Sequence, residues 1–327
     1  MAQRKLNKQQ KERVRQKQEK NRSKASLSVD DQQAEQTGLV ILNHGKKALI
    51  EDQAGELWDC DIRQNLGGLV CGDNVIWQPA TEEKKGVILA VSPRTNFLAR
   101  PDFRKQSKPF VANIDQIIIV AAIEPELSLH LLDRYLIILE MVKLQGVIII
   151  NKTDLFDKKS LDAIHTQMAV YEKIGYPVLY SSAATDTGID TLNQHLKNKR
   201  SIFVGQSGVG KSSLINRIIP DLNIRVGKLT QANHGKHTTS SSTLYHLSGG
   251  GDMVDSPGIR DFALWHIDQP TIEAGFREFM PYKGLCRFHN CLHVSEPDCA
   301  VKQAVEDGEI SEIRLQSYQQ MLSEIEE

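Results

Sequence analysis

The stretch that most constrains this chain is a glycine-rich loop at residues 205–213, which reads Gly-Gln-Ser-Gly-Val-Gly-Lys-Ser-Ser. It matches the pattern G-x-x-x-x-G-K-S. An apolar run at 201–204 leads into it, and apolar residues at helical spacing follow from 214 to 219. Strand, loop and helix in this order are the context that a phosphate-binding loop requires. The backbone N–H groups of such a loop, with the N-terminal end of the helix, form a cradle for phosphate oxygens.

Two side chains of this loop have predicted roles of their own. Lys211 can reach the terminal phosphates, and the Ser212 hydroxyl can bind Mg²⁺. A chance glycine-rich turn is disfavoured by eight matching residues in the right context, although the loop alone does not identify the nucleotide. The predicted phosphate-binding residues are Gly205, Gln206, Ser207, Gly208, Val209, Gly210, Lys211, Ser212 and Ser213.

Length and composition indicate a multidomain globular protein. A chain of 327 residues fits two or three domains, and 40% hydrophobic with 25% charged residues fits a soluble protein. We find no apolar run long enough to cross a membrane and no signal peptide. We therefore expect a cytoplasmic protein, and nothing in the sequence demands more than a monomer.

The first 36 residues are polar and strongly basic. Residues 1–24 hold ten Lys or Arg against two Glu, so this segment carries +8 and the rest of the chain −9, given −1 overall. A basic arm on an acidic body is typical of nucleic-acid contact, because neutralised phosphates supply sequence-independent affinity. The alternative is a solvated tail without a partner. With so little to bury, residues 1–36 should be disordered, or helical only when bound to a partner.

Residues 37–101 alternate short β-rich runs with turns. Five such runs in about sixty residues favour a small barrel, with an OB-fold as the leading candidate. Barrels of this kind often bind nucleic acid on one face, and a plain spacer domain is the alternative. Cys60 and Cys71 lie here and are expected to be buried small hydrophobes. The predicted strands are 38–42, 46–51, 57–62, 73–77 and 86–91.

After a polar connector at 102–108, residues 109–270 show the alternation of a parallel α/β domain. Strands are predicted at 116–123, 146–150 and 177–180, with another ending at residue 254, and helices at 128–144, 160–174 and 188–196. The remaining segment, 271–327, is expected to begin with a helix at 271–279. It passes through a cysteine and histidine cluster and ends in helices at 301–306 and 311–325.

Two loops of the α/β domain indicate guanine. Strand 147–150 runs into Asn-Lys-Thr-Asp, an N-K-x-D motif, and strand 177–180 runs into Ser-Ser-Ala. The Asp154 carboxylate can accept from guanine N1–H and its amino group, whereas adenine would leave the charge unpaired. Asn151 would tie neighbouring loops together, the Lys152 stem would lie over the base, and backbone N–H groups of the second loop would contact the guanine carbonyl. The predicted base-binding residues are Asn151, Lys152, Thr153, Asp154, Ser181, Ser182 and Ala183.

Two further segments match switch elements. Residues 255–258 read D-S-P-G, and residues 235–239 read G-K-H-T-T within the polar stretch 231–242. Asp255 would hold Mg²⁺ through water, and the Gly258 N–H would sense the γ-phosphate. The predicted switch and magnesium residues are Ser212, Thr238, Thr239, Asp255 and Gly258.

The motifs stand in an unusual order. A GTPase usually has its phosphate loop first and N-K-x-D late, whereas here N-K-x-D comes first, which indicates a circularly permuted GTPase domain. Ile259 stands where Ras-like enzymes place a water-orienting Gln, so intrinsic hydrolysis should be slow. His237 is our candidate for positioning the nucleophile; a structural role or a partner contact is the alternative for this histidine.

A metal site is predicted in the last segment. The spacing C-x₄-C-x-H-x₅-C offers three thiolates and one imidazole, a full tetrahedral set suited to one structural Zn²⁺. The predicted ligands are Cys286, Cys291, His293 and Cys299, with His289 as an alternative ligand.

These motifs, in this order, resemble the ribosome small-subunit-dependent GTPase family, RsgA (also called YjeQ), over about residues 37–300. The resemblance implies an OB-fold, a circularly permuted GTPase domain and a C-terminal zinc-binding domain. It also implies a GTPase that assists late maturation of the small ribosomal subunit, binds the subunit and its rRNA with GTP, and is released after subunit-stimulated hydrolysis to GDP. The alternative is a guanine-nucleotide-sensing RNA-binding module with little turnover. A P-loop metabolite kinase is disfavoured, because N-K-x-D with D-x-P-G is a GTPase set.

Overall fold

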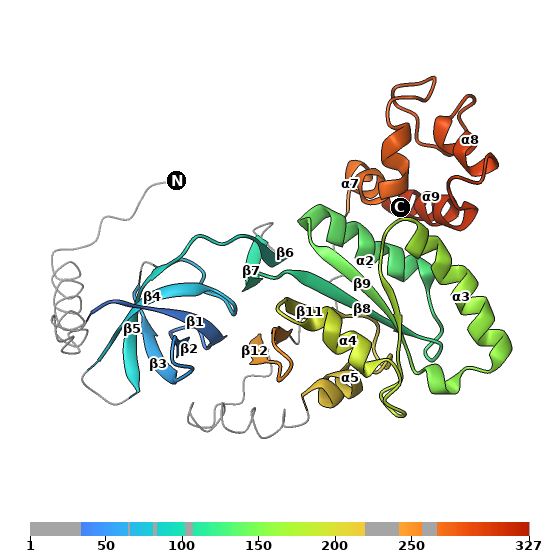
Figure 1. Ribbon diagram of the computed structural model, residues 1–327. Coiled ribbons are helices and arrows are strands. Elements are labelled where there is room, and N and C mark those ends of the chain that lie inside the picture. Colours follow the sequence, from blue (N-terminus) through green and yellow to red (C-terminus); the bar gives the residue numbers. More distant parts are fainter. Residues whose placement is uncertain are drawn as a thin grey trace, which may run out of the picture.

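The computed structural model describes residues 34–64, 66–80, 84–101, 107–219, 242–256 and 267–326. A β-barrel, an α/β sheet with its helices and a helical C-terminal part follow one another along the chain (Figure 1). In the described part of the chain, no helix is long and apolar enough to cross a membrane.

The barrel is built from β1 to β5, and it confirms the predicted OB-fold. The order is β1-β2-β3-β5-β4, and β4 pairs back onto β1, which closes the barrel. Its core includes Ile50, Trp77 and Ile88, each 0% exposed, and Cys60 is buried among them as predicted. Cys71 is buried too. The strands are Gln36–Asn43, Lys47–Asp52, Leu57–Ile62, Asn74–Pro79 and Lys85–Val91.

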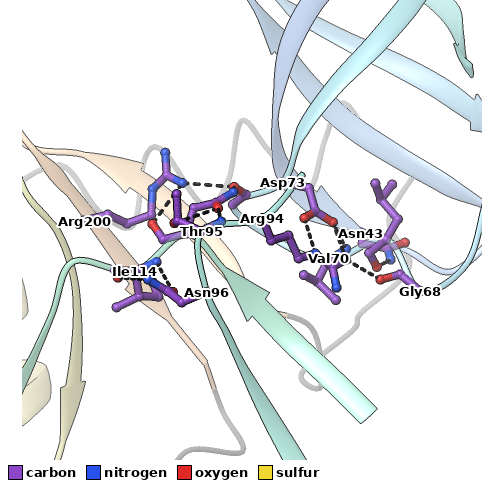
Figure 2. Close-up of polar contacts among 12 residues, drawn as sticks. Asn43, Gly68, Val70, Asp73, Arg94, Thr95, Asn96, Ile114 and Arg200 are labelled. Atoms are coloured by element: carbon purple, nitrogen blue, oxygen red, sulfur yellow. Dashed lines mark hydrogen bonds and ion pairs between the residues drawn. The ribbon is translucent and has the colours of Figure 1, made fainter. Parts of the chain in front are cut away.

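A short hairpin that the sequence did not reveal links the barrel to the sheet. Strands β6 (Phe97–Pro101) and β7 (Ser107–Ala112) pair antiparallel, so the predicted connector is in part a strand. Just before it, Arg94 donates to both oxygens of the buried Asp73, at 2.6 and 2.8 Å, and to the carbonyl of Gly68 (Figure 2). This two-point ion pair fixes the chain where it leaves the barrel.

The α/β sheet has the order β10-β9-β8-β11-β13-β12, parallel except for β12. Strands β8 and β9 are almost continuously apolar and buried, as expected of strands covered on both faces. The predicted strands are found, while β12 was not predicted. The bounds are β8 Gln116–Ala122, β9 Gln145–Asn151, β10 Val178–Tyr180, β11 Arg200–Val204, β12 Thr243–His246 and β13 Asp252–Asp255.

Four helices cover this sheet: α2 (Leu129–Val142) and α3 (Lys158–Lys173) on one face, α4 (Ile189–Leu196) and α5 (Lys211–Ile218) on the other (Figure 1). The sides differ because β8, β9 and β10 advance in one direction across the sheet, and the chain then returns to β11. The reversal falls between β8 and β11, and ligands of such sheets bind at that point, beside the carboxyl ends of the strands.

The C-terminal helices pack over α2 (Figure 1). They are α7 (Gln269–Gly275), the 3₁₀ segment η3 (Arg277–Tyr282), α8 (Ala300–Glu306) and α9 (Glu312–Glu326). The prediction of one helix over 271–279 is wrong, because the chain leaves helical geometry at Phe276, with ψ 87°. A side chain at Gly275 would approach Ile137 of α2 to 2.7 Å, so only glycine allows this close approach.

Candidate nucleotide-binding site and metal centre

The phosphate loop lies between β11 and α5 with glycine at its strained positions. Gly205 has φ 137° and Gly210 has φ 92°, in the region that favours glycine. A Cβ at Gly205 would come within 2.1 Å of the Val120 carbonyl of β8. The backbone N–H groups of residues 206–210 donate to no other described residue. This is the donor arrangement that an anion cradle requires.

Lys211 bends back over the loop. Its ammonium donates to the carbonyls of Gly205 and Gln206, at 2.7 and 2.6 Å. Ser212 and Ser213, in the first turn of α5, are exposed. Among the described residues, this segment therefore combines the Lys211 ammonium, backbone N–H groups that donate to no other described residue, and the exposed Ser212 and Ser213.

Asn151 connects three loops, as predicted. It is 1% exposed at the end of β9, and its amide nitrogen donates to the Val209 carbonyl of the phosphate loop at 2.9 Å. Its oxygen accepts from the Ser181 hydroxyl at 3.2 Å. A Cβ on Gly210 would approach the same amide nitrogen to 2.3 Å. One amide thus holds the N-K-x-D, S-S-A and phosphate loops at a common edge.

The other N-K-x-D side chains are also held in place. Lys152 has φ 62° and donates to the Glu124 carbonyl at 2.8 Å, an anchor after β8 that sequence reasoning missed. Thr153 and Asp154 form the short 3₁₀ segment η1 (Thr153–Leu155). The exposed Asp154 carboxylate accepts from the hydroxyl of the fully buried Ser182. The S-S-A loop therefore contributes the Ser182 side chain, as well as backbone groups, to the candidate base site.

Two of the three backbone N–H groups of the S-S-A loop already donate to carbonyls of the protein. Fewer of them can therefore contact a guanine carbonyl than the sequence predicted. The Ser181 N–H donates to the Ile150 carbonyl and the Ser182 N–H to the Thr187 carbonyl, both at 2.9 Å. The Ala183 N–H donates to no other described residue. It is the one donor of residues 181–183 that remains for a base carbonyl.

Only part of the predicted switch set can be located. Asp255 is exposed at the end of β13, which pairs with β11, so it lies at the same sheet edge as the phosphate loop. The predictions for His237, Thr238, Thr239, Gly258 and Ile259 fall outside the described residues.

The four predicted metal ligands converge. The ligand atoms of Cys286, Cys291, His293 and Cys299 all lie within 4.8 Å of one another. The Nδ1 atom of His293 is 3.6, 3.5 and 3.2 Å from the three sulfurs, in that order along the chain. This group could hold a metal ion. His289 is exposed and is not part of the group.

The surroundings fix the geometry of this metal group. His293 is 5% exposed, and its ring lies against Phe279 and Tyr318, with centroids 5.9 Å apart in each case. The Glu296 carboxylate accepts the N–H groups of Leu292 and Val294, at 2.7 and 3.0 Å, on both sides of the histidine. These bonds fix the backbone of the ligand loop.

The sheet order and the loops at its carboxyl edge define a circularly permuted P-loop GTPase. The model of the RsgA GTPase family matches residues 91–265. The Small ribosomal subunit biogenesis GTPase RsgA of Hahella chejuensis (strain KCTC 2396) is 45% identical over 341 residues, covering 100% of this chain and 98% of that protein. This chain belongs to the RsgA GTPase family.

Two solved structures are similar over nearly their whole length. The crystal structure of YjeQ from Thermotoga maritima is 35% identical with a TM-score of 0.75, covering 89% of this chain and 99% of that one. The structure of YloQ, described as a circularly permuted GTPase, is 31% identical with a TM-score of 0.71, covering 91% and 97%.

Proposed function

We propose that this chain is a GTP hydrolase that acts in the biogenesis of the small ribosomal subunit. The observation that carries the nucleotide part is the buried Asn151 amide, which joins the phosphate loop to both base loops. The ribosomal part is supported by the full-length similarity to proteins with that name.

Each loop would bind one part of the nucleotide. The N–H groups of residues 206–210 would face the phosphates, and a bound phosphate would compete with the Gly205 and Gln206 carbonyls for the Lys211 ammonium. Asp154 would accept from guanine while Ser182 holds it in place, and the Ala183 N–H would donate to the guanine carbonyl. The nucleotide-binding residues in this proposal are Asn151–Asp154, Ser181–Ala183 and Gly205–Ser213.

Magnesium bound with GTP would neutralise charge on the phosphates. The Ser212 hydroxyl and the Asp255 carboxylate lie at the sheet edge from which they would bind it, and Thr238, Thr239 and Gly258 complete the proposed switch set. His237 remains our candidate for positioning the attacking water, because Ile259 has no group that can orient it.

Zinc is the metal that the C-terminal group fits best. Bonds of about 2.3 Å to sulfur and 2.0–2.1 Å to nitrogen place tetrahedral ligands about 3.5–3.8 Å apart. The distances from His293 Nδ1 to the three sulfurs are 3.2–3.6 Å, and the sulfurs of Cys286 and Cys299 are 3.9 Å apart. Four ligands leave no open position, so the ion would be structural.

The proposed partners follow from the roles proposed for the separate parts of the chain. The chain would act as a cytoplasmic monomer on the small subunit and its rRNA, alternating between GTP and GDP. Its parts would be a basic arm at 1–36, an OB-fold at 37–101, the permuted GTPase domain at 109–270 and the zinc-binding part at 271–327. The OB-fold and the basic arm are the surfaces suited to RNA.

Hydrolysis of GTP by the purified chain, alone and with isolated ribosomal subunits, tests this function. We expect slow hydrolysis alone and strong stimulation by small but not large subunits. Asp154→Asn serves as the matched variant, because it keeps the phosphate loop while removing the carboxylate that accepts from guanine. It should lose the preference for GTP over ATP.

Intact GTP binding without stimulation by small subunits would contradict the enzymatic proposal and favour a nucleotide sensor. Unchanged selectivity of Asp154→Asn would contradict the assignment of the base site.

A further inference from the structure

Strand β12 belongs to both the GTPase sheet and the barrel. It pairs antiparallel with β13 over four residue pairs, from Thr243↔Asp255 to His246↔Asp252. On its other side it pairs with β1 of the barrel at Leu42↔Thr243. These pairings merge the two parts into one sheet of eleven strands. The barrel is therefore attached through the backbone of this strand.

The β12–β13 hairpin also lies between the two predicted switch elements. The chain enters β12 directly after the stretch 231–242 and leaves β13 at Asp255, the first residue of D-S-P-G. At this end the hydroxyls of Ser242 and Ser256 are 2.9 Å apart, and both residues are buried. A displacement of either switch element would thus act on the same end of the hairpin.

A polar bridge connects the other end of the hairpin to the barrel. Both nitrogens of His246 contact carboxylates: Nδ1 lies 2.7 Å from Asp252 of β13, and Nε2 lies 2.6 Å from Glu51 of β2. Hydrogen bonding to Asp252, followed by the charge of Glu51, raises the pKa of His246 to about 9. The imidazole is therefore charged at neutral pH and donates from both nitrogens.

A second contact supports the bridge from β11. The Arg200 guanidinium donates to Asp252 at 3.2 Å and to the barrel carbonyl of Gly72 at 3.0 Å. Arg200 begins β11, the strand that leads into the phosphate loop. Asp252 is therefore held by cationic side chains from two strands, Arg200 of β11 and His246 of β12. The barrel is thus contacted at Glu51 and at Gly72, on different loops and strands.

The barrel and β12 also share a cluster of buried apolar side chains. Ile41, Leu42 and Leu49 of the barrel belong to the same buried cluster as Leu244 and Tyr245 of β12. The barrel's own core, around Trp77, is a separate cluster. Moving the barrel relative to β12 would expose this apolar contact, so barrel and hairpin should move together.

We propose that the β12–β13 hairpin transmits the nucleotide state of the switch elements to the barrel, and that the His246–Glu51 contact sets the strength of this coupling. The proposal rests on the proposed function, since it requires that the chain bind both GTP and GDP. Coupling between sites is reciprocal. RNA that holds the barrel in one position would change the ratio of the GTP and GDP affinities by the same factor.

Amide hydrogen exchange tests the coupling in the full-length, zinc-loaded chain. Exchange of residues 36–52 is compared with GDP and with a non-hydrolysable GTP analogue, and nucleotide affinities are measured alongside. We expect exchange rates in this region to differ by about fivefold or more between the nucleotides, the low end of typical allosteric coupling. Glu51→Gln and His246→Gln should each reduce the difference to less than about twofold while both nucleotides still bind.

Glu56→Gln is the matched control. Glu56 is an exposed barrel carboxylate that pairs with Lys84 and not with a described residue of the hairpin, so this variant should behave like the wild type. Unchanged exchange in strands β3 and β4 shows that each variant keeps its barrel.

Three results would count against the proposal. Equal exchange with both nucleotides in the wild type, with both bound, would overturn the coupling and leave the proposed function intact. A full nucleotide difference in both Glu51→Gln and His246→Gln would overturn the role of the bridge. Failure to bind guanine nucleotides would overturn the proposed function, and the inference with it.

Discussion

One small polar side chain, that of Ser182, holds the charged Asp154 of the candidate site in position. The Ser182 hydroxyl donates to Asp154 and also accepts the N–H groups of Ala184 and Thr185, each at 3.2 Å. It is fully buried, whereas the carboxylate that it holds is exposed. The aspartate is therefore positioned by a group that the base itself would not contact.

Removing this hydroxyl should weaken guanine binding. Ser182→Ala loses a hydrogen bond to a charged group, which contributes about 1.5–3 kcal/mol, or roughly 10- to 150-fold in affinity. The dissociation constant of GDP should rise accordingly. Thr185→Ala is the control, because its hydroxyl contacts Thr187 and not Asp154. Equal affinities for Ser182→Ala and wild type would contradict the positioning role.

His246 should make stability depend on pH. Its folded pKa of about 9 lies above the ordinary value of 6.5. The contribution of the charged histidine to the free energy of unfolding is therefore complete below pH 6.5 and is lost as pH rises toward 9. The groups that face it are Glu51, Asp252 and, through Asp252, Arg200.

Melting temperatures of the wild type and His246→Gln, measured from pH 6 to 9.5, isolate this effect. The wild type should be more stable at pH 6, and the difference should vanish above about pH 9. A difference that grows with pH would show that the histidine is not stabilised as an imidazolium.

Among the elements, α9 is anchored to the GTPase part by one buried cation. Arg314 is 1% exposed and forms ion pairs with the fully buried Asp133 of α2 and with Glu278 of η3. Tyr171 of α3 also donates to Asp133, at 2.8 Å. Four elements therefore meet at a single guanidinium, whose removal would leave two buried carboxylates without their cation.

Arg314→Met should destabilise the packing of the C-terminal helices by about 3–5 kcal/mol, the usual cost of removing one partner of a buried ion pair. Native-state hydrogen exchange in α7 and α9 measures this locally. Arg287→Met is the control: it breaks an ion pair with Asp298 whose side chains are 62% and 66% exposed, so its effect should stay below about 1 kcal/mol. Similar effects of the two variants would contradict the anchoring role.

At the scale of the whole molecule, the metal group and the candidate nucleotide site belong to different parts of the chain. The four ligands lie within residues 286–299, whereas the loops of the nucleotide site end at Ser213 and the sheet edge at Asp255. The ligand loop packs on Phe279 and Tyr318, which belong to the C-terminal part itself. Loss of the metal should therefore disrupt that part and spare the sheet.

Cys291→Ser should abolish zinc binding and unfold the ligand loop while GDP affinity changes little. Elemental analysis of the purified chain gives the metal content, and a GDP titration gives the affinity. His289→Ala should keep one zinc per chain, because this histidine is exposed outside the ligand group. Loss of zinc in His289→Ala but not in Cys291→Ser would reverse the ligand assignment.

Local patterns predicted much of this architecture, and long-range pairing accounts for most of what they missed. The apolar run of β8 and the C-x₄-C-x-H-x₅-C spacing each depend on neighbouring residues and could be read directly. Strand β12 has four residues in a Ser-rich region, and its partner β1 lies about 200 residues away in sequence. Arg314 stands in an amphipathic helix, where a charged residue normally faces solvent, and only the fold reveals its burial.

The permuted order also dictates the sequence in which the site can be made during synthesis. Strands β8, β9 and β10 are adjacent both along the chain and in the sheet, so this half can form as soon as residue 180 has left the ribosome. Strand β11 must then insert beside β8, and β13 beside β11, before the phosphate loop has both neighbours. The two loops proposed to bind the base are therefore synthesised first, and the phosphate loop gains both of its neighbouring strands only when residue 255 has emerged.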